Sequence, residues 1–344
     1  MRLCITMHSL MTPYFFFIFG SALVISLVLT PLTIRLARRM HWLDEPSPRR
    51  THVQPTPRIG GVPLAIAFLV ALSLTLSFPR TDEKELLRVY GLMLGVALIA
   101  VVGFVDDVRE LKPLSLFAMQ FGAALIAIAS GVRILEIPNP LGGAGIFLPE
   151  WLGIAFTVFW IVGMMNTVNF LDGLDGLVGG VTLIAGAVMF LLTYKLEQYS
   201  LALLPLALIG ATLGVLVFNF PPAKIFLGAG AYILGFALAV LSIIGGAKVA
   251  TALLALAIPI LDVAWQILNR VRAGKSPFAA DRGHLHHRLY DMGWSTRAIV
   301  LSYYALTALF GALALLLPNP VYKLIALLVI GGGALAVLAR LRRG

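Results

Sequence analysis

Apolar residues occur in long runs along this chain, and short polar segments separate the runs. A helix needs about 20 predominantly apolar residues to cross a bilayer. The pattern therefore predicts an all-α, polytopic integral membrane protein with about eleven transmembrane helices, or ten if one of the shorter runs does not span. The runs are 13–36, 60–79, 86–104, 113–130, 150–168, 175–194, 200–218, 227–244, 248–267, 298–317 and 320–340.

Composition agrees with the pattern. Hydrophobic residues make up 60% of the 344 residues and charged residues only 12%, whereas a soluble domain contains about 25% charged residues. The single cysteine, Cys4, excludes a disulfide within the chain and a cysteine-based metal site. The first apolar run is too long for a signal peptide and lacks a small-residue cleavage pattern, so we expect it to be a true span.

Positive charges indicate the orientation of the chain. With these spans, 18 of the 26 Lys and Arg residues fall on one side. Cytoplasmic loops carry such an excess, so we expect a cytoplasmic (inner) membrane protein whose N-terminus lies outside. The net charge of +10 is then assigned to these loops and to anionic headgroups or phosphates rather than to nucleic acid.

This orientation places every polar cluster on the cytoplasmic side. We therefore expect residues 1–344 to form a single transmembrane domain in which five cytoplasmic loops form one site. The loops are 37–59, 105–112, 169–174, 219–226 and 268–297.

The central cluster holds two amides and two carboxylates, at Asn166, Asn169, Asp172 and Asp175, between two apolar segments. Polar groups in such a position are costly unless they bind something. A glycine follows each Asp, and its missing Cβ lets a ligand approach the backbone. The alternative is a connecting loop made of turn-forming Asp and Gly.

A second pair of carboxylates, Asp106 and Asp107, ends the third predicted span. Adjacent carboxylates repel each other unless a cation neutralises them. Such a pair typically holds Mg²⁺ or places a base beside it. An exposed helix end, which costs little in water, is the alternative.

Two further loops are basic. Arg58 and His52 lie in a proline-rich segment with Arg49 and Arg50, and guanidinium groups suit phosphate oxygens. A patch that only sets membrane topology is the alternative there.

The loop 268–297 carries His284, His286 and His287 within four residues. A transition metal would fit His-x-His-His. We prefer imidazoles that donate to a pyrophosphate, and a solvated basic loop stays open. Asp262, in the preceding apolar run, is expected to form a structural ion pair with Arg270 or Arg272 rather than to act in catalysis.

These pieces, in this order, resemble the polyprenyl-phosphate N-acetylhexosamine-1-phosphate transferase superfamily. Its members move a sugar-1-phosphate from a UDP-sugar to the phosphate of a lipid carrier. The resemblance covers about Asp44 to Leu289. Its motifs are Arg49-x-x-His52 with Pro57-Arg58-x-Gly60-Gly61, Asp106-Asp107, Asn166-x-x-Asn169-x-x-Asp172-Gly-x-Asp175-Gly, Phe226-Leu-Gly228 and His284-x-His286-His287.

The resemblance implies roles for these residues. It implies that Asp106, Asp107 and Asp172 are catalytic and hold Mg²⁺, with Mn²⁺ as the alternative ion. Asp175, with Gly173 and Leu174, would contact the uracil, and Phe226 would stack on it. The full set expected to bind the nucleotide and diphosphate is Arg58, His52, Asn166, Asn169, Gly173, Leu174, Asp175, Phe226, His284, His286 and His287.

The His-Leu-His-His form resembles the branch that uses UDP-GlcNAc for O-antigen, teichoic-acid or similar polymers. The implied reaction moves N-acetylhexosamine-1-phosphate from UDP-N-acetylhexosamine to undecaprenyl phosphate and releases UMP, as the first step of a lipid-linked surface polysaccharide. A homodimer in the lipid bilayer is the implied assembly. The alternative is the phospho-MurNAc-pentapeptide transferase of peptidoglycan synthesis, which has consecutive histidines and a Lys where Glu110 stands here.

One departure matters. The family has an Asp after the Phe-Leu-Gly motif that resembles a principal Mg²⁺ ligand, and here Ala229 follows Gly228. Loss of a ligand to a hard cation weakens metal binding and turnover. An inactive chain, a residue missing from the sequence at this point and a site that recruits another carboxylate are the three explanations.

Other classes stay open on the sequence alone. Intramembrane Asn and Asp are typical of transporters, although transporters place them near the midplane and between repeated halves. A CDP-alcohol transferase also uses Asp and Mg²⁺, but its Asp-Gly-x-x-Ala-Arg spacing is missing. A lipid-binding scaffold without catalysis would explain the lost Asp.

Overall fold

A computed structural model describes residues 2–45, 54–80, 82–137, 139, 144–245, 249–276, 283–317 and 320–340. Its helices are α1 (Arg2–Arg39), α2 (Gly61–Leu74), the 3₁₀ helix η1 (Thr75–Ser77), α3 (Glu83–Arg109), α4 (Pro113–Ala129), α5 (Glu150–Leu171), α6 (Leu177–Lys195), α7 (Tyr199–Asn219), α8 (Gly230–Ile244), α9 (Val249–Ala255), α10 (Ala257–Arg272), α11 (Leu285–Asp291), α12 (Thr296–Leu316) and α13 (Pro320–Arg340). The strands form two short antiparallel hairpins, β1 (Leu43–Asp44) with β2 (Thr56–Pro57) and β3 (Glu136–Ile137) with β4 (Ile146–Phe147).

The predicted all-α membrane fold is confirmed, and each predicted run coincides with a helix or a helix pair. The predicted number of spans is not confirmed. In the described part of the chain, six helices are long and apolar enough to cross a membrane, and a seventh counts if α9 and α10 form one bent span. Among the described residues, three more apolar helices, α2 with η1, α4 and α8, are shorter than a full span.

The run 248–267 is not the single straight helix that we expected. It divides into α9 and α10, which meet at an angle of 80°. Pro259 explains the break, because its ring crowds the carbonyl four residues earlier, at Ala255, and its nitrogen has no hydrogen to donate. Helix α9 ends at Ala255.

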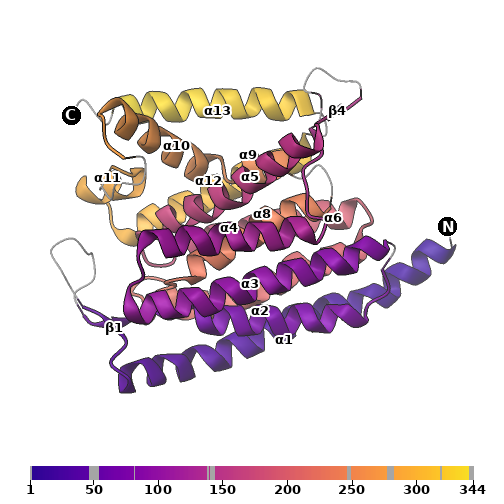
Figure 1. Ribbon diagram of the computed structural model, residues 1–344, viewed down its shortest axis with the longest axis horizontal. Coiled ribbons are helices and arrows are strands. Elements are labelled where there is room, and N and C mark those ends of the chain that lie inside the picture. The colour runs from indigo at the N-terminus through magenta and orange to yellow at the C-terminus, as the bar shows by residue number, and fades with distance from the viewer. Residues whose placement is uncertain are drawn as a thin grey trace.

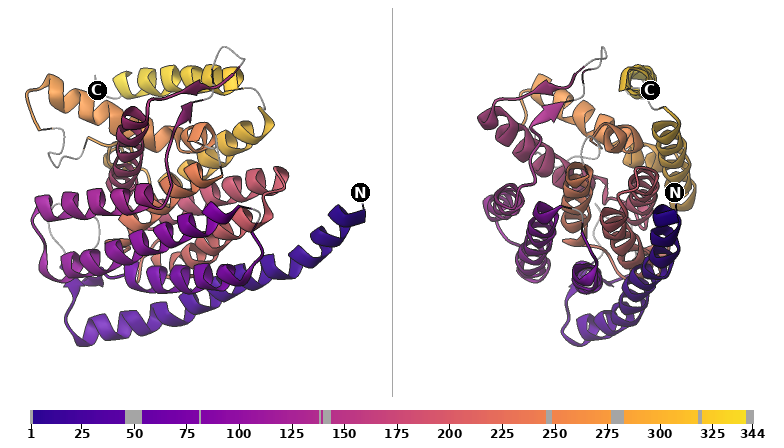
Figure 2. Two further views of the ribbon diagram at one scale, coloured as in Figure 1. Left: turned by 45° about the vertical axis from the view of Figure 1, so that its right-hand side comes forward. Right: turned by 90° about the vertical axis from the view of Figure 1, so that its right-hand side faces the viewer.

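The helices pack side by side into a bundle, with α1 along one border and α13 along the other (Figure 1). The end-on view in Figure 2 shows many of them in cross-section. Helix α1 packs against α7 and α2, and α5 packs against α8. Every residue of α8 is buried, so this helix forms the centre of the bundle, where its apolar side chains meet those of its neighbours.

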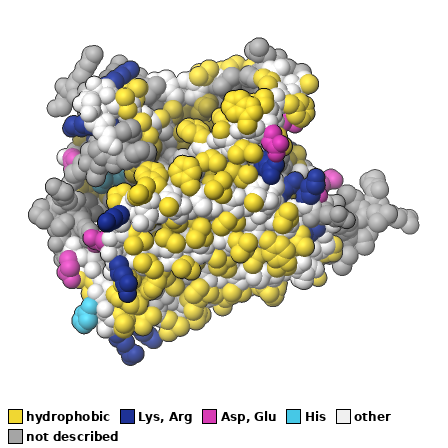
Figure 3. Space-filling view, in the orientation of Figure 1, with side chains coloured by type: hydrophobic (Ala, Val, Ile, Leu, Met, Phe, Trp, Pro, Cys, Tyr) yellow, Lys and Arg dark blue, Asp and Glu magenta, His cyan; other side chains and the backbone are white. Residues whose placement is uncertain are grey.

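The outer surface suits lipid. Hydrophobic atoms cover the middle of the face shown in Figure 3, and charged groups lie mainly towards its two margins. Large apolar side chains are exposed on several helices, among them Phe16, Leu114, Phe159 and Leu316, each at least 70% exposed. A soluble monomer rarely exposes so much contiguous apolar surface. The chain is therefore a multi-pass membrane protein.

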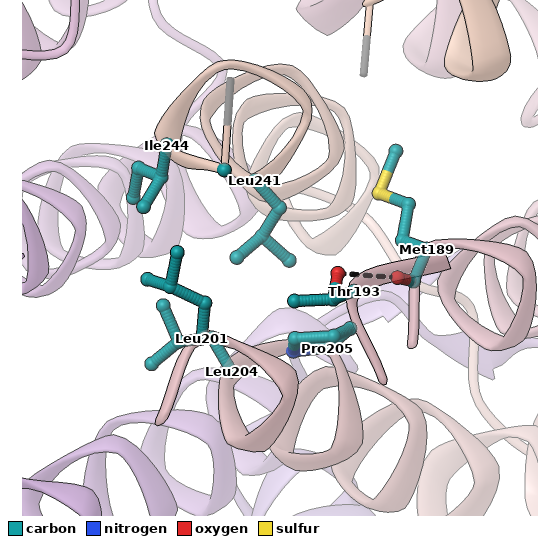
Figure 4. A pocket seen from close by; sticks show the side chains of 8 residues that line it. Met189, Thr193, Leu201, Leu204, Pro205, Leu241 and Ile244 are labelled. Atoms are coloured by element: carbon teal, nitrogen blue, oxygen red, sulfur yellow. Dashed lines mark hydrogen bonds between the residues drawn. The ribbon is translucent and has the colours of Figure 1, made fainter. Parts of the chain in front are cut away.

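The bundle has two ends. Helices α3, α5, α7 and α10 all terminate at the end that carries β1, β2 and α11, here called the site end. A small pocket lies near the opposite end, between the last turns of α6 and α8 and the start of α7 (Figure 4). Its lining is apolar except for Thr193, whose hydroxyl donates to the carbonyl of Met189. It is therefore separate from the polar clusters.

Several residues that we assigned to loops belong to helices. Helix α3 continues to Arg109, so Asp106 and Asp107 lie in its last turn and not in a loop 105–112. Helix α5 continues to Leu171 and includes Asn169. The segment 268–297 contains the last residues of α10, the whole of α11 and the start of α12. Helices extend past the apolar runs because polar side chains in a terminal turn can face the aqueous boundary.

Candidate active site

Asp107 joins three segments at the site end. Its side chain is 2% exposed, and its two oxygens accept the backbone N–H of Ala229 at 3.1 and 3.0 Å. The Nε of Arg58 lies 3.7 Å away. Ala229 caps the N-terminus of α8, where unpaired amides favour a negative charge. The carboxylate therefore connects the end of α3, the segment after β2 and the start of α8.

Gly228 is required at this junction. Its φ is +55°, which is favourable only for glycine. A Cβ on Gly228 would lie 2.5 Å from both carboxylate oxygens of Asp107 and 2.0 Å from the carbonyl oxygen of Arg58. Any side chain here would push the three groups apart.

The Phe226 segment pairs with the segment after β2 through backbone hydrogen bonds. The N–H of Phe226 donates to the carbonyl of Pro57 at 2.8 Å, and its carbonyl accepts the N–H of Gly60 at 2.9 Å. Two motifs that are far apart in the sequence thus form one wall, with the ring of Phe226 half-buried.

Asp106 has a different environment from its neighbour. It is half-buried, and its Oδ1 accepts the N–H of Leu111 at 2.8 Å. Glu110, between them, has a φ of +50° and ends α3. The two adjacent carboxylates therefore differ: Asp107 is enclosed and held on both oxygens, and Asp106 stays partly open to the surroundings.

The segment after α5 brings the third and fourth carboxylates. Asp172 follows the last residue of α5, and burial raises the pKa of its carboxyl to about 7, against the opposing charge of Arg58. Asp175 accepts the N–H of Ala223 at 2.9 Å. The side chain of Asn219 accepts the N–H of Gly176 at 3.1 Å and so fixes the turn. This segment is joined to residues 219–226.

Asn166 joins two helices through its side chain, which we did not predict. Its side-chain amide donates to Oε1 of Gln120 in α4 at 2.6 Å and to the carbonyl of Val162 at 2.8 Å. The pair holds α4 against α5 in the interior. Asn169 lies one turn further towards the site end, half-buried. Gln120 was missed, although a glutamine in the apolar run 113–130 was a visible signal.

The histidine segment lies against Gly173. A Cβ on Gly173 would come within 2.3 Å of Nε2 of His286 and 3.1 Å of Cε1 of His287. His286 is fully buried, and neither of its ring nitrogens has a hydrogen-bond partner among the residues that the structure describes. Burial lowers its pKa well below the usual value, so the ring is neutral.

The three imidazoles differ in their surroundings, and their expected donation to a pyrophosphate stays a prediction. His284 is buried and tied to Asp262, with 3.0 Å between Nδ1 and Oδ2. His286 is fully buried, and its ring contacts the rings of both His284 and His287. Only His287 is half-exposed.

The expected partner of Asp262 was also wrong. We predicted an ion pair with Arg270 or Arg272, and the structure pairs Asp262 with His284. The guanidinium of Arg270 approaches the other side of that ring, with 3.4 Å between Nη2 and Nε2. The contact joins residues 22 positions apart, so helix periodicity gave no signal for it.

Five segments thus converge at the site end. The contacts that join them are Arg58 with Asp107, Asp107 with Ala229, Phe226 with Pro57 and Gly60, Asp175 with Ala223, and Gly173 with His286. Leu174 is buried in the core. His52 lies outside the described residues. Whether these side chains bind substrate stays a prediction.

The donor set does not fit a metal site held by the protein alone. In the ranges that the structure describes, no group of three or more His, Cys, Asp or Glu side chains is arranged to hold a metal ion. The backbone N–H of Ala229 faces Asp107 next to the position where the resemblance implies a further carboxylate. A hard cation such as Mg²⁺ prefers oxygen ligands, and here an amide donor occupies the oxygens of Asp107.

Comparison with known proteins identifies the chain's relatives. Residues 89–246 match the model of glycosyl transferase family 4. A probable undecaprenyl-phosphate N-acetylglucosaminyl 1-phosphate transferase of Bacillus subtilis is 32% identical, covering 87% of this chain and 83% of the relative. A decaprenyl-phosphate N-acetylglucosaminephosphotransferase of Mycobacterium tuberculosis is 32% identical, covering 94% of this chain and 88% of the relative.

A third relative represents the peptidoglycan branch. The phospho-N-acetylmuramoyl-pentapeptide-transferase of Oceanobacillus iheyensis is 31% identical, covering 85% of this chain and 94% of the relative. All three names describe transferases. The relatives therefore form an enzyme family, which argues against the transporter alternative. The chain belongs to glycosyl transferase family 4, as a member of the polyprenyl-phosphate N-acetylhexosamine-1-phosphate transferase superfamily.

Proposed function

We propose that this membrane transferase moves GlcNAc-1-phosphate from UDP-GlcNAc to undecaprenyl phosphate and releases UMP. One oxygen of the lipid phosphate attacks the β-phosphorus of the UDP-sugar. The bond from that phosphorus to the bridging oxygen breaks, and UMP leaves with the bonding electrons. The product is a lipid-linked GlcNAc diphosphate, the first intermediate of a surface polysaccharide.

One observation carries this proposal. Arg58 lies beside Asp107 and acts electrostatically on Asp172, and the histidine segment lies against Gly173, the residue next to Asp172, at the same end of the bundle. Phosphoryl transfer depends mostly on positioning and on neutralising charge. A site at the end of the spans suits a lipid phosphate, because the headgroup of a carrier lies at the membrane boundary while its tail stays among the apolar helices.

Each group has a role in this scheme. Arg58 is 40% exposed and donates to phosphate oxygens. Asp106, the more open of the pair, lies nearest the lipid phosphate, and Asp107 stays fixed by Ala229. His287 donates to the diphosphate. Asp172, with a pKa of about 7, holds or releases a proton near neutral pH.

A second group of residues would bind the base. Asp175 and Phe226 lie on two connected segments, with the half-buried ring of Phe226 available for stacking on uracil. Gly173 leaves room for the backbone to meet the nucleotide. Calorimetry tests this assignment: we expect UDP to bind more tightly than ADP, and equal affinities would contradict it.

The required cation is a separate proposal. Because the protein's own carboxylates do not form a complete ligand set, Mg²⁺ (or Mn²⁺) would arrive with the UDP-sugar and be held mainly by phosphate oxygens. We also propose that the site end faces the cytoplasm in the inner membrane, as the excess of Lys and Arg there favours.

The sugar follows from two local features. The His-Leu-His-His form and Glu110 differ from the pattern of the peptidoglycan branch, and the Bacillus and Mycobacterium relatives carry N-acetylglucosamine in their names. UDP-MurNAc-pentapeptide is the competing donor, because relatives in that branch are nearly as similar.

A transfer assay tests the proposal. Purified protein in lipid nanodiscs receives undecaprenyl phosphate and radiolabelled UDP-GlcNAc or UDP-MurNAc-pentapeptide, with Mg²⁺, Mn²⁺ or a chelator. We expect labelled lipid and UMP in equal amounts, from UDP-GlcNAc only and with a divalent ion present. Transfer from the pentapeptide donor would assign the chain to the peptidoglycan branch instead. No transfer from either donor would indicate an inactive member, as the missing Asp allows.

A further inference from the structure

Asp262 is a buried carboxylate outside the proposed catalytic group, and both of its oxygens accept hydrogen bonds. It lies in α10 and is 3% exposed. Its Oδ2 accepts from Nδ1 of His284 at 3.0 Å, and its Oδ1 accepts the backbone N–H of Leu285 at 2.9 Å. A buried charge needs such partners to be tolerated. Both oxygens therefore face the first residues of the histidine segment.

The contact fixes one form of His284. Because Nδ1 carries the hydrogen donated to Asp262, the neutral ring leaves Nε2 as an acceptor. Nη2 of Arg270, which can only donate, lies 3.4 Å from that nitrogen. The face of the ring stacks on Phe170 of α5, with 5.8 Å between the ring centroids. Each side of His284 thus meets a group that suits this tautomer.

Neighbouring contacts hold the backbone at the same place. The carbonyl of Gly283 accepts from the side chain of Gln266, one turn after Asp262 on α10, and from Nε of Arg288 at 2.7 Å. Leu285 is the first residue of α11. Asp262 and Gln266 therefore set where this short helix begins, and so which side chains of α11 face α5.

This register has a consequence for the site. With α11 beginning at Leu285, His286 lies against Gly173, and the half-exposed His287 follows it, beside the residue next to Asp172. A shift of one residue along α11 would turn these side chains by about 100° around the helix axis. The imidazole next to the phosphate site would then be a different one.

We propose that Asp262 is a positioning residue of the transferase: it fixes the tautomer of His284 and the start of α11, and thereby places His287 at the diphosphate site. The inference rests on the proposed function, because it gives the histidine segment a diphosphate to bind. A purely structural ion pair would leave the affinity for the diphosphate unchanged. In a positioning role, Asp262 would affect that affinity without touching the diphosphate.

Asp262→Asn tests the proposal, because asparagine has one acceptor oxygen and one NH₂ group. If the oxygen keeps the N–H of Leu285, the NH₂ faces Nδ1 of His284 and forces the hydrogen onto Nε2. ¹⁵N NMR of protein labelled at histidine, in nanodiscs, reports this change directly, and His284→Gln assigns the signal. We expect the tautomer to switch and the dissociation constant for UDP to rise about tenfold.

Two further variants separate positioning from stability. Asp262→Glu keeps both acceptors, so we expect it to keep the wild-type tautomer and to recover most of the UDP affinity. Asp291→Asn removes a charge from an exposed position at the end of α11, and we expect no change in either measurement. In the double variant Asp262→Asn with His284→Gln, the loss of UDP affinity should equal that of one single variant.

The outcomes separate the two ideas. An unchanged tautomer in Asp262→Asn, or a changed tautomer with unchanged UDP affinity, would overturn the positioning role and leave the proposed function intact. If Asp262→Asn does not fold, loss of UDP affinity in a folded Asp262→Glu with an unchanged tautomer would overturn it. If wild-type protein does not bind UDP, the proposed function itself fails, whereas the NMR signal still shows whether Asp262 sets the tautomer.

Discussion

Gly173→Ala is the sharpest test of the contact between the two central motifs. The added methyl would lie 2.3 Å from Nε2 and 3.0 Å from Cδ2 of His286. Ordinary contact begins at 3.4 Å, so the ring must move by about 1 Å. His286 cannot yield easily, because it is fully buried and its ring contacts two other imidazoles. Displacement of α11 from the segment that carries Gly173 would relieve the overlap.

The size of the effect follows from the cost of overpacking. An extra methyl in a well-packed interior costs about 1–3 kcal/mol, which corresponds to a factor of roughly 5 to 150 in the equilibrium between docked and displaced α11. Because the diphosphate is proposed to bind the docked form, KM for the UDP-sugar should rise by up to that factor, as the docked fraction falls. Initial rates of labelled transfer at varied UDP-sugar concentration measure it.

Gly163→Ala is the matched control. Gly163 lies in α5, the helix that precedes Gly173, and no atom would come within 4 Å of a Cβ at that position. Alanine favours a helix over glycine by about 1 kcal/mol, so this variant should be at least as stable and fully active. A wild-type KM in Gly173→Ala, with unchanged thermal stability, would refute the packing of the histidine segment against Gly173.

Three further predictions concern other parts of the site. Burial raises the pKa of Asp172 from 3.8 to about 7, so its contribution to stability is complete below about pH 3.8 and is lost as the pH rises through about 7; Asp172→Asn should flatten the melting temperature across that interval, and an unchanged profile would contradict the assigned burial. Gln120→Leu and Asn166→Leu should each cost about 1–3 kcal/mol by leaving a buried amide unpaired, while the double variant recovers part of the loss; strictly additive losses in thermal unfolding would argue against the pair. Inserting Asp between Gly228 and Ala229 should raise Mg²⁺-dependent transfer, whereas inserting Asn should not; equal rates for both insertions would show that the carboxylate is not what this position needs.

The fold was largely predictable because the membrane imposes one rule on every span. Backbone polar groups in lipid must be paired within a helix, so long apolar runs have little choice of structure. The break at Leu256 was also within reach, since Pro259 crowds the carbonyl of Ala255. The extension of α3 through Asp106 and of α5 through Asn169 was not predictable. Apolar periodicity does not indicate where a helix ends once its residues become polar.

The composition of the site was predictable, and its internal contacts were not. Motif order brought Asp107, Asp172 and the histidines to one end through the orientation of the spans. The pairing of Asp262 with His284, and of Asn166 with Gln120, depends on how helices rotate against each other. A single sequence does not indicate that rotation. The predicted partners of Asp262 were therefore the nearest cations along the chain, Arg270 and Arg272.

The balance of charge at the site bears on the missing Asp. In the proposed reaction, three carboxylates, Asp106, Asp107 and Asp172, would face two phosphorylated substrates that are themselves anionic. Arg58 is the only guanidinium that the described residues place within ion-pair distance of Asp107. The amide of Ala229 offsets part of one negative charge, and buried, neutral His286 offsets none. Coulomb repulsion would therefore oppose binding unless a cation accompanies the diphosphate. A chain that lacks one carboxylate starts with less repulsion and with a weaker hold on the cation, so its rate should depend more steeply on Mg²⁺ concentration than that of a relative with the complete ligand set.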